Sequence, residues 1–247
     1  AHEQSGEERR IAVKRFLRGV GNPNPCFLLM GMLVLSFALS RLSPYFWTGR
    51  NIANIIDQAS VGIILSMGMT FVVAAAGIDL SIGANIALSS LVAALFLKQG
   101  FGCLPSVFAG LLLASMSGVL NGSLISFLHL NPFIVTLCTM SVFRGAALLL
   151  TDGRPVFGFP ESFMSLGSVL PGGVSVPALT ALSVAGLSMF LMRFTKFGAY
   201  ACFMGCNEEA LSRSGGNCHR WKLAFYAVSS LCSGIAGLIL CARLNTA

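Results

Sequence analysis

A few polar and charged residues interrupt the long apolar stretches of this sequence, and they are the first candidates for chemistry. They are Asp57, Asp79, Ser81, Asn85, Asn121 and Arg144. An ionisable side chain at membrane depth is costly, and such groups usually mark the path of an ion or a substrate. Asn and Asp side chains can instead hydrogen-bond a neighbouring helix. Both interpretations, a polar path and interhelical hydrogen bonding, stay open at this point.

The segment Gly77-Ile78-Asp79-Leu80-Ser81-Ile82-Gly83 places one carboxylate between two apolar runs. Gly77 can end the incoming helix, and Asp79 or Ser81 can cap the next one, where the helix dipole stabilises a negative charge. Ile52–Leu97 is long enough for two full spans at about 1.5 Å per residue. We therefore expect a tight hairpin on the cytoplasmic side. Capping is the favoured role, and a place in a translocation path is the alternative.

A second polar segment separates the last two apolar runs. Asn207 is suited to be a helix N-cap, and Glu208 and Glu209 follow in the first turn, where the helix dipole favours acids. This pattern predicts a short helix that runs to Ser214 and stops at Gly215. Such a helix can contact a cytosolic partner or can simply connect two spans.

The residue types do not indicate an enzyme. No Ser/His/Asp, Cys/His or HExxH arrangement occurs, and the histidines are His2, His129 and His219. We expect no catalytic residue, metal or cofactor. Cys202, Cys206 and Cys218, together with His219, can in principle ligate zinc, but ordinary small residues in a reduced compartment are the favoured interpretation.

The elements that carry these residues are predicted to be transmembrane helices. Hydrophobic residues make up 55% of the chain and charged residues 10%, whereas soluble domains carry about 25% charged residues. Runs of about 20 apolar residues cross a bilayer as helices, and the alternation of a β-barrel is missing from the sequence. The fold class is therefore all-α, a polytopic transmembrane helical bundle.

The apolar runs predict seven spans within a transmembrane domain, 26–247, preceded by a cytoplasmic N-terminal segment, 1–25. The spans are Cys26–Leu42, Ile52–Ala76, Ser81–Leu97, Pro105–Leu128, Pro132–Thr151, Val174–Met192 and Trp221–Cys241. Gly118 and Gly122 form a small-xxx-small pair that favours close helix packing.

The basic residues predict the orientation. Loops assigned to the inside hold Arg9, Arg10, Lys14, Arg15, Arg18, Arg193, Lys196, Arg213, Arg220 and Lys222. Outside loops hold Arg50, Lys98 and Arg154, with Arg41 at a span end. This is the positive-inside pattern, so the N-terminus is expected in the cytoplasm. The net charge of +7 then needs no nucleic-acid partner.

Three motifs resemble the permease subunits of ABC importers of the ribose/xylose/galactoside class. The segment Gly77–Gly83 is similar to that family's Gly-Ile-Asp-Leu-Ser-Val-Gly motif. Asn131–Leu137, followed by Phe143-Arg144-Gly145 and Gly153-Arg154-Pro155, resembles a second hallmark. The segment from Phe197 to Gly215 resembles the cytoplasmic loop that docks on the ATPase.

The resemblance implies a multi-pass permease of the bacterial inner membrane that moves a monosaccharide, such as a pentose or hexose. Its implied partners are a cytosolic ATP-binding subunit, a periplasmic sugar-binding protein, a second or sister permease, and membrane lipid. The implied ATPase-docking residues are Asn207, Glu208, Glu209, Ala210, Ser214 and Gly215. The implied pathway or helix-break residues are Asp79, Ser81, Asn85, Asn121 and Arg144.

The sequence also departs from the family. Cys206 stands where the family usually has glycine, and the chain stops at Ala247, where family members continue into further spans. The resemblance therefore predicts a permease that lacks the C-terminal helices. Two rival functions stay open: an ion-coupled secondary transporter that uses Asp79 and Arg144, and a membrane subunit that does not transport.

Overall fold

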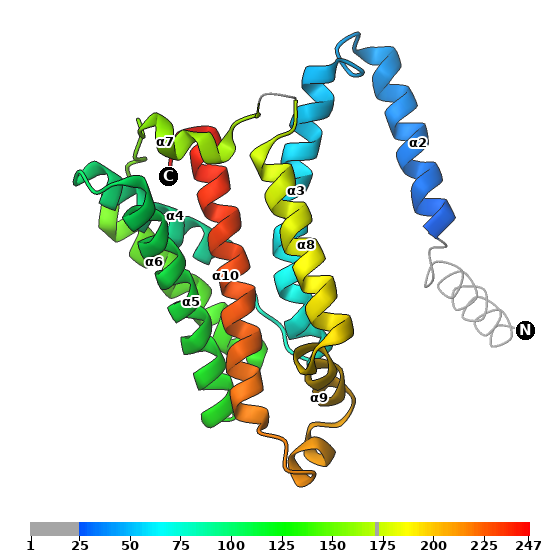
Figure 1. Cartoon of the computed structure of the whole chain (residues 1–247), viewed down its shortest axis with the longest axis vertical. Helices are drawn as coiled ribbons and strands as arrows, with labels where there is room; N and C mark the ends of the chain where they lie inside the picture. The colour runs from blue at the N-terminus through cyan, green and yellow to red at the C-terminus, as the bar shows by residue number, and fades with distance from the viewer. Residues whose placement is uncertain (1–24, 171–172) are drawn as a thin grey trace, which may run out of the picture. The chain divides into compact units, whose positions relative to one another are not determined.

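The computed structural model describes residues 25–170 and 173–247, and this part of the chain is built from helices (Figure 1). Extended pairing within it is limited to two isolated bridges, Phe157 with Thr246 and Val169 with Ser175. The all-α prediction is therefore confirmed. The basic segment expected before the first span lies outside the described residues.

Seven helices coincide with the seven expected spans, and their ends lie within three residues of the expected ones. They are α2 (Pro25–Leu42), α3 (Gly49–Ala74), α4 (Ile82–Lys98), α5 (Cys103–Phe127), α6 (Pro132–Thr151), α8 (Val176–Phe194) and α10 (Cys218–Leu244). The other described helices are α7 (Glu161–Met164), the 3₁₀ turn η1 (Ser165–Gly167) and α9 (Lys196–Arg213).

Five of the described helices, α3, α5, α6, α8 and α10, are long and apolar enough to cross a membrane. The other two apolar helices, α2 and α4, are shorter over their described residues. A multi-pass membrane bundle is therefore confirmed. The count of seven spans and the cytoplasmic N-terminus stay predictions.

The chain divides into two compact units, residues 1–54 and 55–247. In the described part of the first unit, α2 exposes its apolar side chains along its length. Local hydrogen bonds shape the turn that follows it: Thr48 Oγ1 donates to the Tyr45 carbonyl, and Asn51 Nδ2 donates to the Phe46 carbonyl, both at 2.8 Å.

In the second unit, α10 is the central helix (Figure 1). In its most apolar window 61% of the residues are buried, against 17–33% for the other long apolar helices of the described residues. Helices α4 and α5 pack against α10 on one side, and Ile64 of α3 and Ala181 of α8 pack against it elsewhere.

Close contact between α5 and α10 depends on Gly118 and Gly122. A Cβ at Gly122 would lie 2.8 Å from the Cα of Leu223, and one at Gly118 would overlap the Tyr226 carbonyl oxygen. Small residues let helix backbones approach this closely. The predicted small-xxx-small contact is therefore confirmed.

Candidate functional site

Four of the candidate polar residues lie together in the interior of the second unit. Asp79, Ser81, Asn85 and Asn121 are each at most 1% exposed. They come from the connection between α3 and α4 (residues 75–81), from α4 and from α5. We call these four residues the polar cluster, together with the serines that bond to them, which are Ser117, Ser229 and Ser230.

Asp79 is held by three donors. Its Oδ1 accepts the Ser81 backbone N–H at 3.0 Å and the Ser81 hydroxyl at 2.6 Å, and its Oδ2 accepts the Ser229 hydroxyl at 3.2 Å. Ser81 Oγ in turn accepts from Asn121 Nδ2 at 2.8 Å. One carboxylate thus links the connection to α10 directly, and to α5 through Ser81.

Asn85 makes the second link to α10. Its Nδ2 donates to the Ser230 carbonyl at 3.1 Å, and its Oδ1 accepts from Ser117 Oγ of α5 at 2.9 Å. The interpretation of interhelical hydrogen bonding is therefore confirmed for Asn85 and for Asn121. Sequence reasoning missed the serines of α10, although small polar residues at spacings of three and four in an apolar helix are a visible signal.

The connection lies partway along α10, not at the bundle surface. Tyr226 Oη donates to the Ile78 carbonyl at 3.1 Å and Ser233 Oγ donates to the Ile82 carbonyl at 2.6 Å. Ser229 lies between Tyr226 and Ser233, in the interior of the 27-residue helix α10. The tight hairpin expected here is therefore buried within the bundle, because donors from α10 satisfy carbonyl groups at Ile78 and Ile82. Its position on the cytoplasmic side stays a prediction.

The capping prediction is only partly right. Ser81 occupies the N-cap position of α4, but its hydroxyl donates to Asp79 and does not accept a helix N–H. Asp79 does accept the backbone N–H of Ser81. Arg144 lies outside the cluster, exposed on α6. Asp57 also lies apart from it, where its Oδ2 is 3.8 Å from Arg243 Nε of α10.

The second candidate region is a short helix, residues 208–213, that forms the last part of α9. Asn207 has a non-helical backbone (φ −162°, ψ 96°), and its Oδ1 accepts the Ala210 N–H at 2.9 Å. The predicted N-cap is therefore confirmed. The helix ends at Arg213, and the chain turns at Gly215, which has φ +86° and whose N–H donates to the Ser212 carbonyl in a Schellman-type stop.

Glu208 and Glu209 of the short helix have different surroundings. Glu208 Oε1 lies 2.7 Å from Lys222 Nζ of α10, and these side chains are 46% and 21% exposed. Glu209 Oε1 lies 2.6 Å from Arg213 Nη2 within the short helix, and these side chains are 75% and 79% exposed. Glu208 thus joins the short helix to the bundle, whereas Glu209 lies on its open surface.

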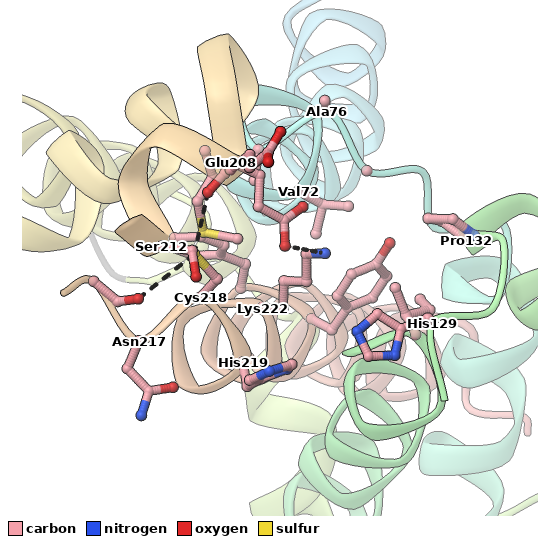
Figure 2. Close-up of a pocket in the computed structure, with 18 of the residues that line it drawn as sticks. Val72, Ala76, His129, Pro132, Glu208, Ser212, Asn217, Cys218, His219 and Lys222 are labelled. Carbon is pink, nitrogen blue, oxygen red and sulfur yellow. Dashed lines mark hydrogen bonds and ion pairs between the residues drawn. The ribbon is translucent and has the colours of Figure 1, made fainter. Parts of the chain in front are cut away.

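A cavity of about 880 Å³ lies between the short helix and the bundle (Figure 2). Glu208 and Lys222 line it, as do His129, His219 and Gly77 of the α3–α4 connection. The cavity therefore extends from the short helix to the residues that precede Asp79.

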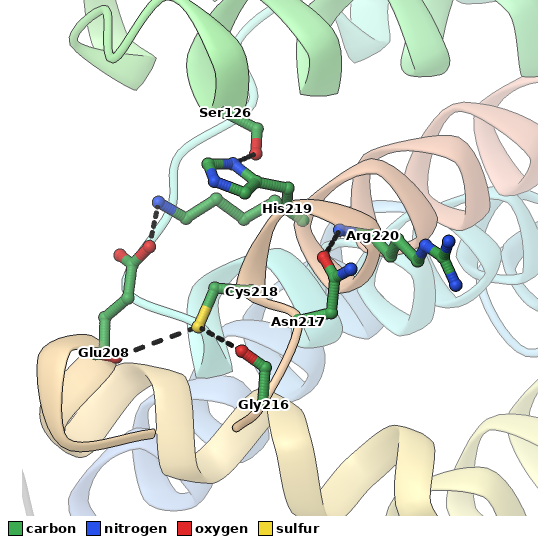
Figure 3. A network of polar contacts seen from close by, with 8 residues as sticks. Ser126, Glu208, Gly216, Asn217, Cys218, His219 and Arg220 are labelled. Carbon is green, nitrogen blue, oxygen red and sulfur yellow. Dashed lines mark hydrogen bonds and ion pairs between the residues drawn. The ribbon is translucent and has the colours of Figure 1, made fainter. Parts of the chain in front are cut away.

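The cysteines near this cavity do not form a metal site. The Cys218 thiol donates to the Glu208 and Gly216 carbonyls, both at 3.7 Å, and His219 Nδ1 bonds Ser126 Oγ at 2.7 Å (Figure 3). Within residues 25–170 and 173–247, no group of three Cys, His, Asp or Glu side chains is placed to hold a metal ion.

Comparisons with known proteins identify what the chain is similar to. The family model described as "branched-chain amino acid transport system / permease component" matches residues 51–247. The ribose import permease protein of Bacillus subtilis is 36% identical over 98% of this chain and 74% of the relative. The D-allose transport system permease protein of Escherichia coli is 35% identical over 90% of this chain and 68% of the relative.

A third relative has nearly complete coverage of the chain. The galactofuranose transporter permease protein of Escherichia coli is 33% identical over 99% of this chain and 73% of the relative. No solved structure matches the chain significantly.

Proposed function

This chain belongs to the permease-component family of branched-chain amino acid transport systems, and we propose that it is the permease subunit of an ATP-binding cassette importer for a monosaccharide. The observation that carries the proposal is similarity to sugar permeases over nearly the whole chain. The family description mentions amino acids, but these relatives are named for ribose, D-allose and galactofuranose. The chain is a multi-pass protein of the bacterial inner membrane and a transport component, not an enzyme.

Permeases of ABC importers generally work with an ATPase and a substrate-binding protein. We assign the ATPase contact to the short helix and its flanks, which comprise Asn207, Glu208, Glu209, Ala210, Ser214 and Gly215. Two features support this assignment: the helix is capped at both ends, and it carries the exposed Glu209–Arg213 pair. The positive-inside pattern supports a cytoplasmic position for this loop and for the N-terminus.

We propose that the polar cluster acts as a pivot about which the α3–α4 connection and α10 move relative to each other. Burial of Asp79, Ser81, Asn85 and Asn121 supports a pivot over direct contact with sugar in this conformation. Within the described chain, Asn121 Oδ1 and Ser230 Oγ are buried without a hydrogen-bond partner, and such atoms call for an explanation. A second arrangement of the cluster during transport would supply partners for them. Arg144 stays a pathway candidate because its side chain is exposed on α6.

The test is uptake by proteoliposomes that contain the permease, its ATPase and its sugar-binding protein. D-allose, ribose and galactofuranose are supplied in turn, and we expect ATP-dependent accumulation of one of them. The control replaces ATP by a non-hydrolysable analogue. Uptake driven by an ion gradient without ATP would instead support a secondary transporter, and co-purification with no ATPase would support a subunit that does not transport.

A further inference from the structure

One face of α10 connects the short helix to the polar cluster. Lys222, Tyr226, Ser229 and Ser233 are spaced by four, three and four residues, so they lie on one side of the helix. Lys222 pairs with Glu208, Tyr226 and Ser229 bond the α3–α4 connection at Ile78 and Asp79, and Ser233 bonds Ile82, the first residue of α4. We call these four residues the α10 stripe, which extends over about 16 Å at 1.5 Å per residue.

A close backbone contact also joins α9, whose last part is the short helix, to the end of α3, which leads into the α3–α4 connection. A Cβ at Gly205 of α9 would overlap the Ala74 carbonyl oxygen at the end of α3. Met204 beside it is buried in one core with Phe71 of α3 and Tyr226 of the α10 stripe. The part of α9 that precedes the short helix is therefore packed directly on the residues that lead into the connection.

The short helix itself is less firmly held. It follows the break at Asn207, and the cavity separates it from the bundle (Figure 2). Glu208 and Lys222 both line this cavity, and their ion pair bridges the short helix to α10. The Cys218 thiol adds a weak hydrogen bond to the Glu208 carbonyl (Figure 3). The Glu208–Lys222 pair is therefore the charged contact between the short helix and α10, beside the apolar packing of Leu211 on the core that holds Tyr226.

We propose that Lys222 is a positioning residue that couples movement of the short helix to the polar cluster through the α10 stripe. This inference rests on the proposed function, since the ATPase is what would move the short helix. An effector can shift a conformational equilibrium only through contacts that differ between the two states. The Glu208–Lys222 pair supplies such a contact, and Ser229 carries the change to Asp79.

The test compares Lys222→Met and Lys222→Gln with Lys222→Arg and Arg220→Met in the reconstituted complex. Arg220 is the matched control, because it is a basic residue two positions away whose side chain points away from Glu208 (Figure 3). The readouts are ATPase co-purification, thermal stability, and sugar transported per ATP hydrolysed. A partly exposed ion pair contributes little to folding, so the neutral variants are expected to fold.

We expect Lys222→Met and Lys222→Gln to bind the ATPase and to transport about fivefold less sugar per ATP, a typical coupling effect. Lys222→Arg is expected to keep at least half of the wild-type ratio, and Arg220→Met to match wild type. The coupling role is overturned if both neutral variants transport as much sugar per ATP as the wild type. It is also overturned if Arg220→Met loses as much sugar transported per ATP as they do. If the wild-type chain binds no ATPase, the proposed function itself fails.

Discussion

The polar cluster and the short helix both begin with a polar residue suited to helix capping, yet their surroundings are opposite. Asp79 is 1% exposed and is bonded by donors from its own loop and from α10. The Glu209 side chain is 75% exposed and pairs within its own helix. Because a buried polar group loses water as an alternative partner, the same residue types are expected to contribute to stability in the first region and are available for the proposed docking in the second.

The largest effect is expected from Asp79→Ala. It leaves the Ser81 N–H, the Ser81 hydroxyl and the Ser229 hydroxyl without their acceptor in the interior. Each unsatisfied buried group costs about 1–3 kcal/mol, so we expect a loss of at least about 3 kcal/mol in the free energy of unfolding. Thermal unfolding in detergent measures it.

Two controls separate lost hydrogen bonds from lost charge. Asp79→Asn keeps one acceptor oxygen and is expected to lose less stability than Asp79→Ala. Glu209→Ala removes a carboxylate from the exposed region and is expected to change the unfolding temperature little, because exposed ion pairs contribute at most about 1 kcal/mol. Equal losses in Asp79→Ala and Glu209→Ala would contradict the contrast between the two regions.

The next effect tests how tightly α10 is held beside the cluster. Gly118→Ala introduces a methyl group against the Tyr226 carbonyl oxygen, which belongs to the backbone of α10 and cannot rotate away. Overpacking of this kind costs about 1–3 kcal/mol, again measured by thermal unfolding. Gly145→Ala on α6 is the matched control, because its Cβ would meet nothing within 4 Å. A similar loss in both variants would contradict the packing explanation, because Ala is the better helix former and helix propensity alone would stabilise both.

The features that sequence alone predicted are local. The apolar helices, the Asn207 cap and the stop at Gly215 each depend on residues close together in sequence, so their predicted positions agree with the structure. The depth of Asp79 is not local. It depends on Ser229, which lies 150 positions further along the chain. No spacing within residues 77–83 indicates that a distant helix will supply donors.

The direction of Glu208 was unpredictable for the same reason. Glu208 and Glu209 are adjacent in the sequence, and both fall in the first turn after the Asn207 cap. Only packing against α10 distinguishes them, since it brings Lys222 within 2.7 Å of Glu208. Arg144 is the converse case: the sequence motif groups it with the other candidates, but α6 presents it away from the cluster.

A smaller effect, on association alone, is expected from charge reversal in the short helix. Together, Glu208→Lys and Glu209→Lys are expected to weaken ATPase binding while membrane insertion persists. Because Glu209 is the more exposed, Glu209→Lys alone is expected to weaken binding about tenfold, or 1.4 kcal/mol, through altered charge complementarity. A pull-down titration measures it. Unchanged binding by Glu209→Lys would remove this surface from the docking assignment.

The smallest effect is expected from Asn207→Ala, which tests whether the cap alone sets the start of the short helix. The change removes the acceptor for the Ala210 N–H, which typically costs about 1 kcal/mol, and places a strong helix former where the backbone breaks. Hydrogen exchange at the Ala210 amide should therefore accelerate about fivefold, since 1.4 kcal/mol is a factor of ten. Asn207→Asp keeps the acceptor and is expected to protect Ala210 as the wild type does. Protection of Ala210 in both variants would mean that Glu208–Lys222 and the Cys218 contact hold the break by themselves, which would make the short helix part of the bundle and remove the contrast between the two regions.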